Sequence, residues 1–120
     1  MNKTVMVVDD SLFVRNILRG ILNEKGFTLV AEAASGIEAM RLLHDHRPDI
    51  ILLDIILPDA NGIDLLSSIA AAQPDTKVVI CSTLGQESVI NKALEQGAKA
   101  FIHKPFTADK VAEVLDSLEG

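Results

Sequence analysis

Short apolar segments recur along the chain, and each is too brief to form a helix of ordinary length. Three of them, Val5–Val8, Ile50–Leu53 and Val78–Cys81, are rich in β-branched residues and apolar at every position. This pattern is typical of parallel strands that are buried on both faces of a sheet. Ala100–Ile102 is a fourth such segment, and Thr28–Ala33, which contains a glutamate, is predicted to be an edge strand.

The segments between these strands carry apolar residues at the spacing of amphipathic helices. Ser35 and Glu38 have the spacing of a capping box, and Thr107 is a predicted N-cap. Gly26 and Gly97 are placed to end two of the helices. The apolar stripes of the five predicted helices are Val14, Ile17, Leu18, Ile21 and Leu22; Met40 and Leu43; Leu65, Leu66 and Ile69, after the turn signal Asn61-Gly62; Val89, Ile90, Ala93 and Leu94; and Val111, Val114, Leu115 and Leu118.

The alternation of five strands with five helices predicts the fold class. It implies right-handed crossovers, a parallel sheet and helices on both faces of that sheet. Five units cannot close a barrel of eight, so we expect an open, doubly wound α/β sheet. No linker, repeat or low-complexity segment divides the chain, and residues 1–120 are predicted to form one domain.

Composition then excludes several classes of protein. Hydrophobic residues make up 48% and charged residues 23% of the chain, which excludes a disordered chain. With 11 Lys and Arg against 17 Asp and Glu, the net charge is −6, and there is no Trp or Tyr, so no nucleic-acid partner is expected. A single cysteine, Cys81, together with the lack of a signal-peptide core and of a membrane-length apolar segment, predicts a soluble cytoplasmic domain.

Polar side chains gather where the predicted strands end. Asp9-Asp10 follows the first strand, Asp54 the third, Ser82 the fourth, and Lys104 follows the fifth. Open α/β sheets bind ligands beyond the carboxyl ends of their strands, so these side chains are expected to share one rim of the sheet.

This set of side chains is suited to accepting a phosphoryl group with the help of a metal ion. Three carboxylates placed together repel one another, and a hard divalent cation such as Mg²⁺ offsets that cost. One carboxylate can then attack phosphorus and form an aspartyl phosphate. The oxygens of that group need a cation such as Lys104 and a hydrogen-bond donor such as Ser82.

Asp9-Asp10, Asp54, Ser82 and Lys104-Pro105 stand in the order, and at the strand ends, that are typical of the receiver domain of two-component response regulators. The chain resembles this family over nearly its whole length, and most of all the single-domain, chemotaxis (CheY-like) type. The resemblance implies a flavodoxin-like (βα)5 fold with a five-stranded parallel sheet in the order 2-1-3-4-5.

The resemblance also implies roles for individual residues. Asp54 would accept the phosphoryl group, Asp10 would bind Mg²⁺ directly, and Asp9 would bind it mainly through water. Asp54 and the backbone carbonyl of Ile56 would complete the metal ligands, and Lys104 would hold a phosphoryl oxygen.

A switch and a cis peptide bond follow from the same resemblance. Ser82 would be the switch hydroxyl that moves toward the phosphoryl group. Phe101 occupies the aromatic switch position, where many chemotaxis members carry Tyr. The bond between Lys104 and Pro105 would be cis.

Several other residues could be taken for functional ones, but we expect them to have structural roles. His44 and His46 lie two positions apart and would point in different directions on a helix, so they do not predict a metal site. Cys81 is expected to be a small apolar residue of the core. Packing roles are expected for Phe13, Phe27 and Phe106, and no chemistry is assigned to Asp59, Asp64 or His103.

The predicted function is a phosphorylation-activated signalling switch of a two-component phosphorelay, and not an enzyme. The expected partners are a histidine kinase as phosphodonor and a downstream protein, with a chemotaxis-like output. That protein would bind the face around Ala100–Ile102 and its flanking helices. Phosphorylation could promote a weak homodimer, and no direct nucleic-acid or membrane partner is expected.

Four alternatives stay open. A receiver excised from a longer regulator or hybrid protein would carry the same residues, and Glu119-Gly120 is a candidate cloning remnant. A haloacid-dehalogenase-like phosphatase needs a second Asp two residues beyond its nucleophile, where this chain has Ile56. A dinucleotide-binding protein needs G-x-G-x-x-G after the first strand, which here reads Asp9-Asp10-Ser11-Leu12. A degenerate receiver that only dimerises is disfavoured by the complete set of acids.

Overall fold

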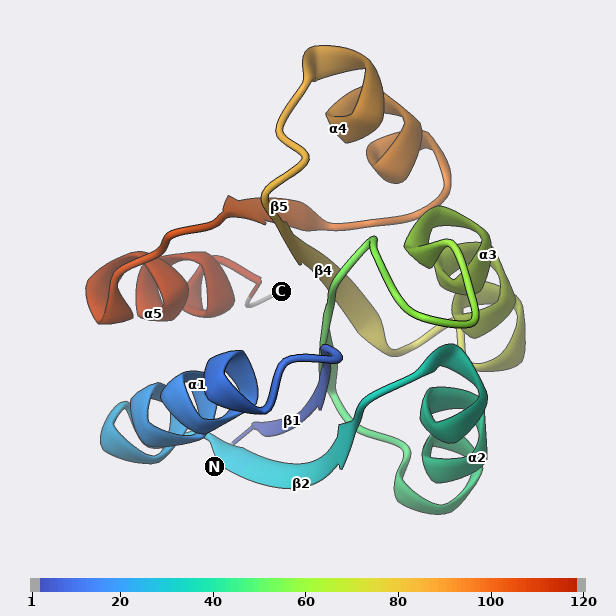
Figure 1. The fold of residues 1–120 in the computed structure, drawn as a ribbon. Coiled ribbons are helices and arrows are strands. Elements are labelled where there is room, and N and C mark those ends of the chain that lie inside the picture. Colours follow the sequence, from blue (N-terminus) through green and yellow to red (C-terminus); the bar gives the residue numbers. More distant parts are fainter. Residues whose placement is uncertain (1–2, 119–120) are drawn as a thin grey trace.

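Strands and helices alternate strictly along the computed structural model, which describes residues 3–118 (Figure 1). The suspected cloning remnant, Glu119-Gly120, lies outside the described residues. The elements are β1 (Thr4–Val8), α1 (Leu12–Glu24), β2 (Thr28–Ala33), α2 (Gly36–His46), β3 (Ile50–Leu53), α3 (Gly62–Ala72), β4 (Lys77–Ser82), α4 (Glu87–Glu95), β5 (Ala100–His103) and α5 (Ala108–Asp116).

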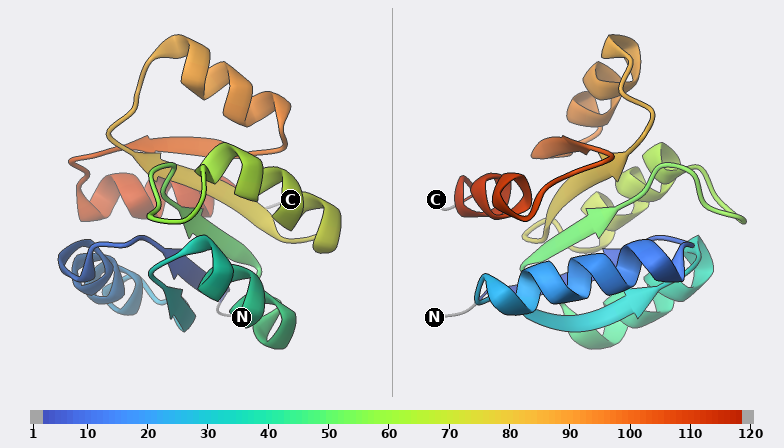
Figure 2. Two further views of the ribbon diagram at one scale, coloured as in Figure 1. Left: turned by 45° about the vertical axis from the view of Figure 1, so that its right-hand side comes forward. Right: turned by 60° about the vertical axis from the view of Figure 1, so that its left-hand side comes forward.

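The strands form one parallel sheet in the order β2-β1-β3-β4-β5, which confirms the expected topology and the edge position of β2. Alternate residues of each strand point to opposite faces, so the sheet separates two apolar layers. Helices α1 and α5 cover one face, and α2, α3 and α4 cover the other (Figure 2). Because β1, β3 and β4 are covered on both sides, their residues from Val5 to Val8, Ile50 to Leu53 and Val78 to Cys81 are all buried.

Helix ends follow the local signals that the sequence contains. The hydroxyls of Ser35 and Thr107 each accept a hydrogen bond from a backbone N–H in the first turn of their helix. Gly26 and Gly97 adopt positive φ values of 85° and 112° directly after two helices, where residues with a Cβ are strained. The capping box differs in one respect: the Glu38 carboxylate accepts from the N–H of Ala34 and not from that of its N-cap.

The predicted packing role of Phe13 is wrong, because its side chain is 74% exposed. Only Leu18, Ile21 and Leu22 of α1 are buried, and Phe13 lies on the outward side of the first turn. Ile17 belongs to the predicted apolar stripe, yet it is 40% exposed, so the buried stripe is narrower than the sequence pattern. Within residues 3–118, every helix is too short or too polar to cross a lipid bilayer.

Candidate functional site

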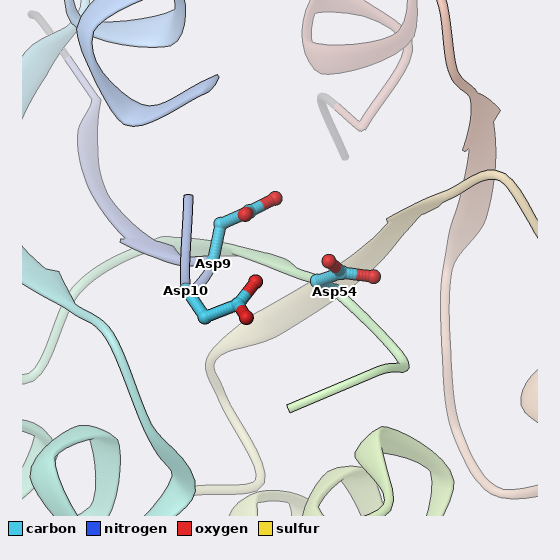
Figure 3. Close-up of side chains that lie close together, drawn as sticks. All are labelled: Asp9, Asp10 and Asp54. Carbon is cyan, nitrogen blue, oxygen red and sulfur yellow. The ribbon is translucent and has the colours of Figure 1, made fainter. Parts of the chain in front are cut away.

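Three carboxylates meet at the carboxyl-terminal edge of the sheet (Figure 3). Asp9 and Asp10 follow β1, and Asp54 follows the neighbouring strand β3. The N–H of Asp54 donates to the carbonyl of Val8 at 2.9 Å, so the two strand ends stay in register up to the acids. One oxygen from each carboxylate lies within 4.8 Å of the others.

The three acids differ in burial and in what holds them. Asp9 is 2% exposed and Asp54 is 8% exposed, whereas Asp10 is exposed to solvent. An Asp9 carboxylate oxygen accepts from the N–H of Ser11 at 2.9 Å, and an Asp54 oxygen accepts from the N–H of Ile56 at 3.2 Å. Asp10 therefore forms the open, solvent-facing side of the cluster.

Lys104 connects the two buried acids. Its Nζ lies 2.6 Å from Asp9 Oδ2 and 3.1 Å from Asp54 Oδ2, and its side chain is only 14% exposed. The backbone N–H of Lys104 donates to the carbonyl of Ser82 at 3.0 Å, which ties the cation to the end of β4. The Lys104–Pro105 peptide bond is cis, as the resemblance implies.

The pKa values of the central pair shift in the same direction for different reasons. Burial raises the pKa of Asp54, and the neighbouring Lys104 charge only partly opposes this effect. Burial alone would lower the pKa of Lys104, but the hydrogen bond to Asp9 and the charge of Asp54 outweigh it and raise that pKa. Lys104 thus stays charged, while the ionised form of Asp54 is costly without a further cation.

Ser82 is the last residue of β4 and is fully buried. The strand reaches one residue further than its apolar segment because Ser82 pairs with His103 of β5 in the sheet register. The Ser82 hydroxyl oxygen accepts from the N–H of Leu84 at 3.2 Å, which leaves its own proton available for another acceptor.

Phe101 lies on β5, opposite Ile80 of β4. It is half-buried and packs against the apolar layer under α2, α3 and α4. Its ring is tilted by 49° to the ring of His103, with centroids 5.1 Å apart. The aromatic side chain is therefore neither locked in the core nor free in solvent.

The loop from Ile55 to Asn61 continues directly from Asp54 at the end of β3. The side chain of Ile56 is 55% exposed, and an isolated antiparallel bridge pairs Ile56 with Asn61. The N–H of Gly62 donates to the carbonyl of Ile55 at 2.7 Å, which closes the loop back onto the end of β3.

Asp59 is a site-supporting residue that the sequence analysis missed. Its carboxylate accepts from the backbone N–H groups of Gly36 at 2.7 Å and of Ile37 at 3.0 Å, at the start of α2. These two hydrogen bonds lower the pKa of Asp59. They tie the loop after β3 to a helix more than 20 residues away in sequence. No local signal could reveal this contact, since the capping position of α2 is already filled by Ser35.

The donor set fits a hard divalent cation. All three side chains offer oxygen, and the exposed Asp10 leaves one side open to water molecules. Mg²⁺ prefers oxygen ligands and retains several waters, so an open cluster of carboxylates suits it better than a closed cage would.

Residues 5–116 match the response regulator receiver domain family. The chain belongs to this family. It is 41% identical to the chemotaxis protein CheY of Listeria monocytogenes over 93% of this chain and 94% of that protein. The identity to CheY of Thermotoga maritima is 38% over 98% of both chains. A crystal structure of a CheX–CheY–BeF3–Mg²⁺ complex from Borrelia burgdorferi superposes with a TM-score of 0.94 and 36% identity, over 97% of this chain and 88% of that one.

These similarities establish the receiver domain as CheY-type and confirm the flavodoxin-like fold in the order 2-1-3-4-5. The function of a phosphorylation-activated signalling switch, expected from the sequence, agrees with this membership. Receiver domains are signalling switches and are generally not classed as enzymes, which favours the switch over the phosphatase and dinucleotide-binding alternatives.

Proposed function

We propose that this receiver domain accepts a phosphoryl group on Asp54 from a phosphohistidine of a partner histidine kinase. The observation that carries the proposal is the contact of Lys104 with both buried acids, within a cluster of three carboxylates. Asp9, Asp10, Asp54 and the backbone carbonyl of Ile56 would hold Mg²⁺. When bound, the ion would neutralise charge on the carboxylates and on the phosphoryl oxygens.

The transfer is a displacement at phosphorus. A carboxylate oxygen of Asp54 attacks, the new P–O bond forms as the P–N bond to the kinase imidazole breaks, and the leaving nitrogen takes the electron pair. Lys104 already donates toward Asp54, so it can hold a phosphoryl oxygen once one carboxylate oxygen has become part of the acyl phosphate. Its hydrogen bond to Asp9 keeps the ammonium group in place.

Ser82 and Phe101 would couple phosphorylation to a conformational change at the protein surface around β5. The Ser82 proton is free to be donated to a phosphoryl oxygen, and a movement of the side chain toward that oxygen would break the hydrogen bond that the Ser82 oxygen accepts from Leu84. Phe101, half-buried on the neighbouring strand, can move toward the space that Ser82 leaves. The phosphoryl group thereby biases an equilibrium between two conformations.

The proposed downstream target is a protein that binds β5 and its flanking helices in the cytoplasm. Chemotaxis proteins are prominent among the relatives, and the Borrelia relative forms a complex with CheX, so we favour a chemotaxis-like output. A receiver that belongs to a longer regulator would use the same site.

Labelling with a small phosphodonor tests the proposal. The chain is incubated with Mg²⁺ and acetyl phosphate, and the expected product is one base-labile, acid-stable phosphoryl group per chain. Asp54→Ala should abolish the label, and Asp64→Ala, which removes an exposed acid of α3, should not. Label that survives in Asp54→Ala would overturn the assignment, and repeated turnover of phosphate esters would indicate a phosphatase.

A further inference from the structure

Arg15 joins α1 to the backbone of the acidic loop. Its Nη1 donates to the backbone carbonyl of Asp9 at 2.7 Å, and its Nε lies 3.2 Å from a carboxylate oxygen of Glu32 on β2. The Arg15 side chain is only 15% exposed, although α1 faces solvent at this end. A largely buried guanidinium that binds both a backbone carbonyl and a carboxylate has little freedom to reorient.

Asp9 is held at every polar atom. Its N–H donates to the carbonyl of Ala33 at 3.0 Å, and its two carboxylate oxygens accept from Ser11 and Lys104. The remaining atom, the backbone carbonyl, is the one that Arg15 binds.

Asp10 is in the opposite situation. Within residues 3–118, no hydrogen bond or ion pair of the protein holds its carboxylate, and the residue is exposed. The point from which that side chain projects is set by its own backbone, which begins at the peptide bond from Asp9. The carbonyl oxygen of that peptide is fixed by Arg15.

We propose that Arg15 is a positioning residue of the metal site: by holding the Asp9–Asp10 peptide plane, it orients the Asp10 carboxylate toward the cation. The inference rests on the proposed Mg²⁺ site. Glu32 serves the same purpose one step away, because it fixes the guanidinium and offsets its charge. Such outer contacts typically change metal affinity by about 10- to 100-fold when they are removed.

Electrostatic repulsion alone predicts the opposite change in Mg²⁺ affinity when Arg15 is removed. A positive charge near the carboxylates repels a divalent cation, so loss of Arg15 should then strengthen Mg²⁺ binding. Arg19 provides a matched control, because its guanidinium pairs with the same Glu32, at 2.5 Å, but among residues 3–118 it forms no hydrogen bond or ion pair with the acidic loop. The two arginines thus separate a charge effect from a positioning effect.

The experiment is a titration of the metal-free chain with Mg²⁺ alone, in which binding is monitored through the amide NMR shifts of residues 9–11 and 54–56. We compare wild type, Arg15→Met, Arg15→Lys and Arg19→Met, since Met keeps the apolar stem and removes the donors. Arg15→Met should weaken binding by roughly 10-fold. Arg15→Lys keeps the charge but cannot reproduce both contacts, so it should fall between wild type and Arg15→Met. Arg19→Met should bind as wild type or slightly more tightly.

The outcomes separate this inference from the function on which it rests. Absence of Mg²⁺ binding in wild type would contradict the metal site itself. Binding in wild type that is equally tight or tighter in Arg15→Met would contradict the positioning role and leave the site intact. Should Arg15→Met fail to fold in EDTA, Arg15→Lys decides the matter, because affinity equal to that of wild type would overturn the proposal.

Discussion

At the scale of single residues, burial makes the ionised form of Asp54 costly, whereas Lys104 stays protonated at the same site. Asp54 is nearly enclosed at the end of β3, and the cost of burying its charge exceeds the attraction of the one ammonium group beside it. Lys104 faces two carboxylates and keeps its proton despite the same burial. The site without metal therefore has more negative charge than its one cation can compensate.

Asp54→Asn should stabilise the metal-free protein at neutral pH. Because the pKa of Asp54 is raised in the folded state, the protonated carboxyl favours folding over unfolding. This stabilisation is fully present below the pKa of an Asp in the unfolded chain, about 3.9, and it is lost as the pH rises through the folded-state pKa. Thermal unfolding in EDTA should show a higher midpoint for Asp54→Asn at pH 7, by about 4 °C for each kcal/mol gained. The advantage should disappear near pH 3. A midpoint below that of wild type at pH 7 would show that the Lys104 contact outweighs the cost of burial.

Gly85 and His103 are predicted to be energetically coupled. A Cβ added at Gly85 would lie 2.5 Å from Nδ1 of His103, so Gly85→Ala must displace the ring that contacts Phe101. We expect Gly85→Ala to be destabilising in the wild-type background and nearly neutral in His103→Ala, with a coupling energy of about 1 kcal/mol. Urea unfolding followed by far-UV circular dichroism suits a chain without Trp or Tyr. Additive effects of the two substitutions would exclude the contact.

At the scale of elements, the start of α3 packs against the backbone of Asp54, the proposed phosphoacceptor. A Cβ added at Gly62 would lie 2.5 Å from the backbone carbonyl oxygen of Asp54 and 2.5 Å from Cα of Ile55. Glycine at this helix start thus permits a close approach of α3 to the end of β3. The same loop is tied to α2 through Asp59.

Gly62→Ala should therefore disturb the site, and Gly20→Ala provides its control. At Gly62 the new methyl group meets backbone, which cannot move aside easily, so we expect a loss of about 1–3 kcal/mol in unfolding free energy. At Gly20, in the middle of α1, the methyl group meets nothing within 4 Å, and alanine should stabilise the helix by about 0.5–1 kcal/mol. Denaturant unfolding and acetyl phosphate labelling measure both effects. A neutral Gly62→Ala would show that the loop adapts without strain.

At the scale of the whole molecule, the site and the proposed output face are joined by β4 and β5. Ser82 ends β4 beside the acids, and Phe101 lies on the adjacent strand, in contact with the layer under α4. A change that begins at the phosphoryl group needs to cross only one pair of strands to reach that surface.

Ser82→Ala should uncouple the acidic site from the surface around Phe101. The substitution removes the buried hydroxyl of the last residue of β4, while Asp54 and Lys104 remain, so beryllofluoride should still bind. The amide shift changes that beryllofluoride causes at Ala100–Ile102 should become much smaller than in wild type. Shift changes of unaltered size would remove the Ser82 hydroxyl from the switch.

Much of this architecture could be predicted from local patterns. Fully apolar segments locate β1, β3 and β4, because the central residues of strands that are covered on both faces are predominantly apolar, and glycines and hydroxyls mark the helix ends. Since parallel strands end at one edge, the convergence of Asp9, Asp10 and Asp54 also follows from the order of the elements.

Contacts between different elements, and the exposure that depends on them, were decided by the tertiary structure alone. The apolar stripe of α1 gave no indication that Phe13 points outward, since helical period does not show where the sheet ends beneath the helix. Asp59 at α2 and Arg15 at the Asp9 carbonyl join elements whose distance and angle depend on how the two apolar layers pack. Local sequence therefore determines which elements form and which rim holds the acids, whereas their precise orientation depends on packing between elements, which no local pattern encodes.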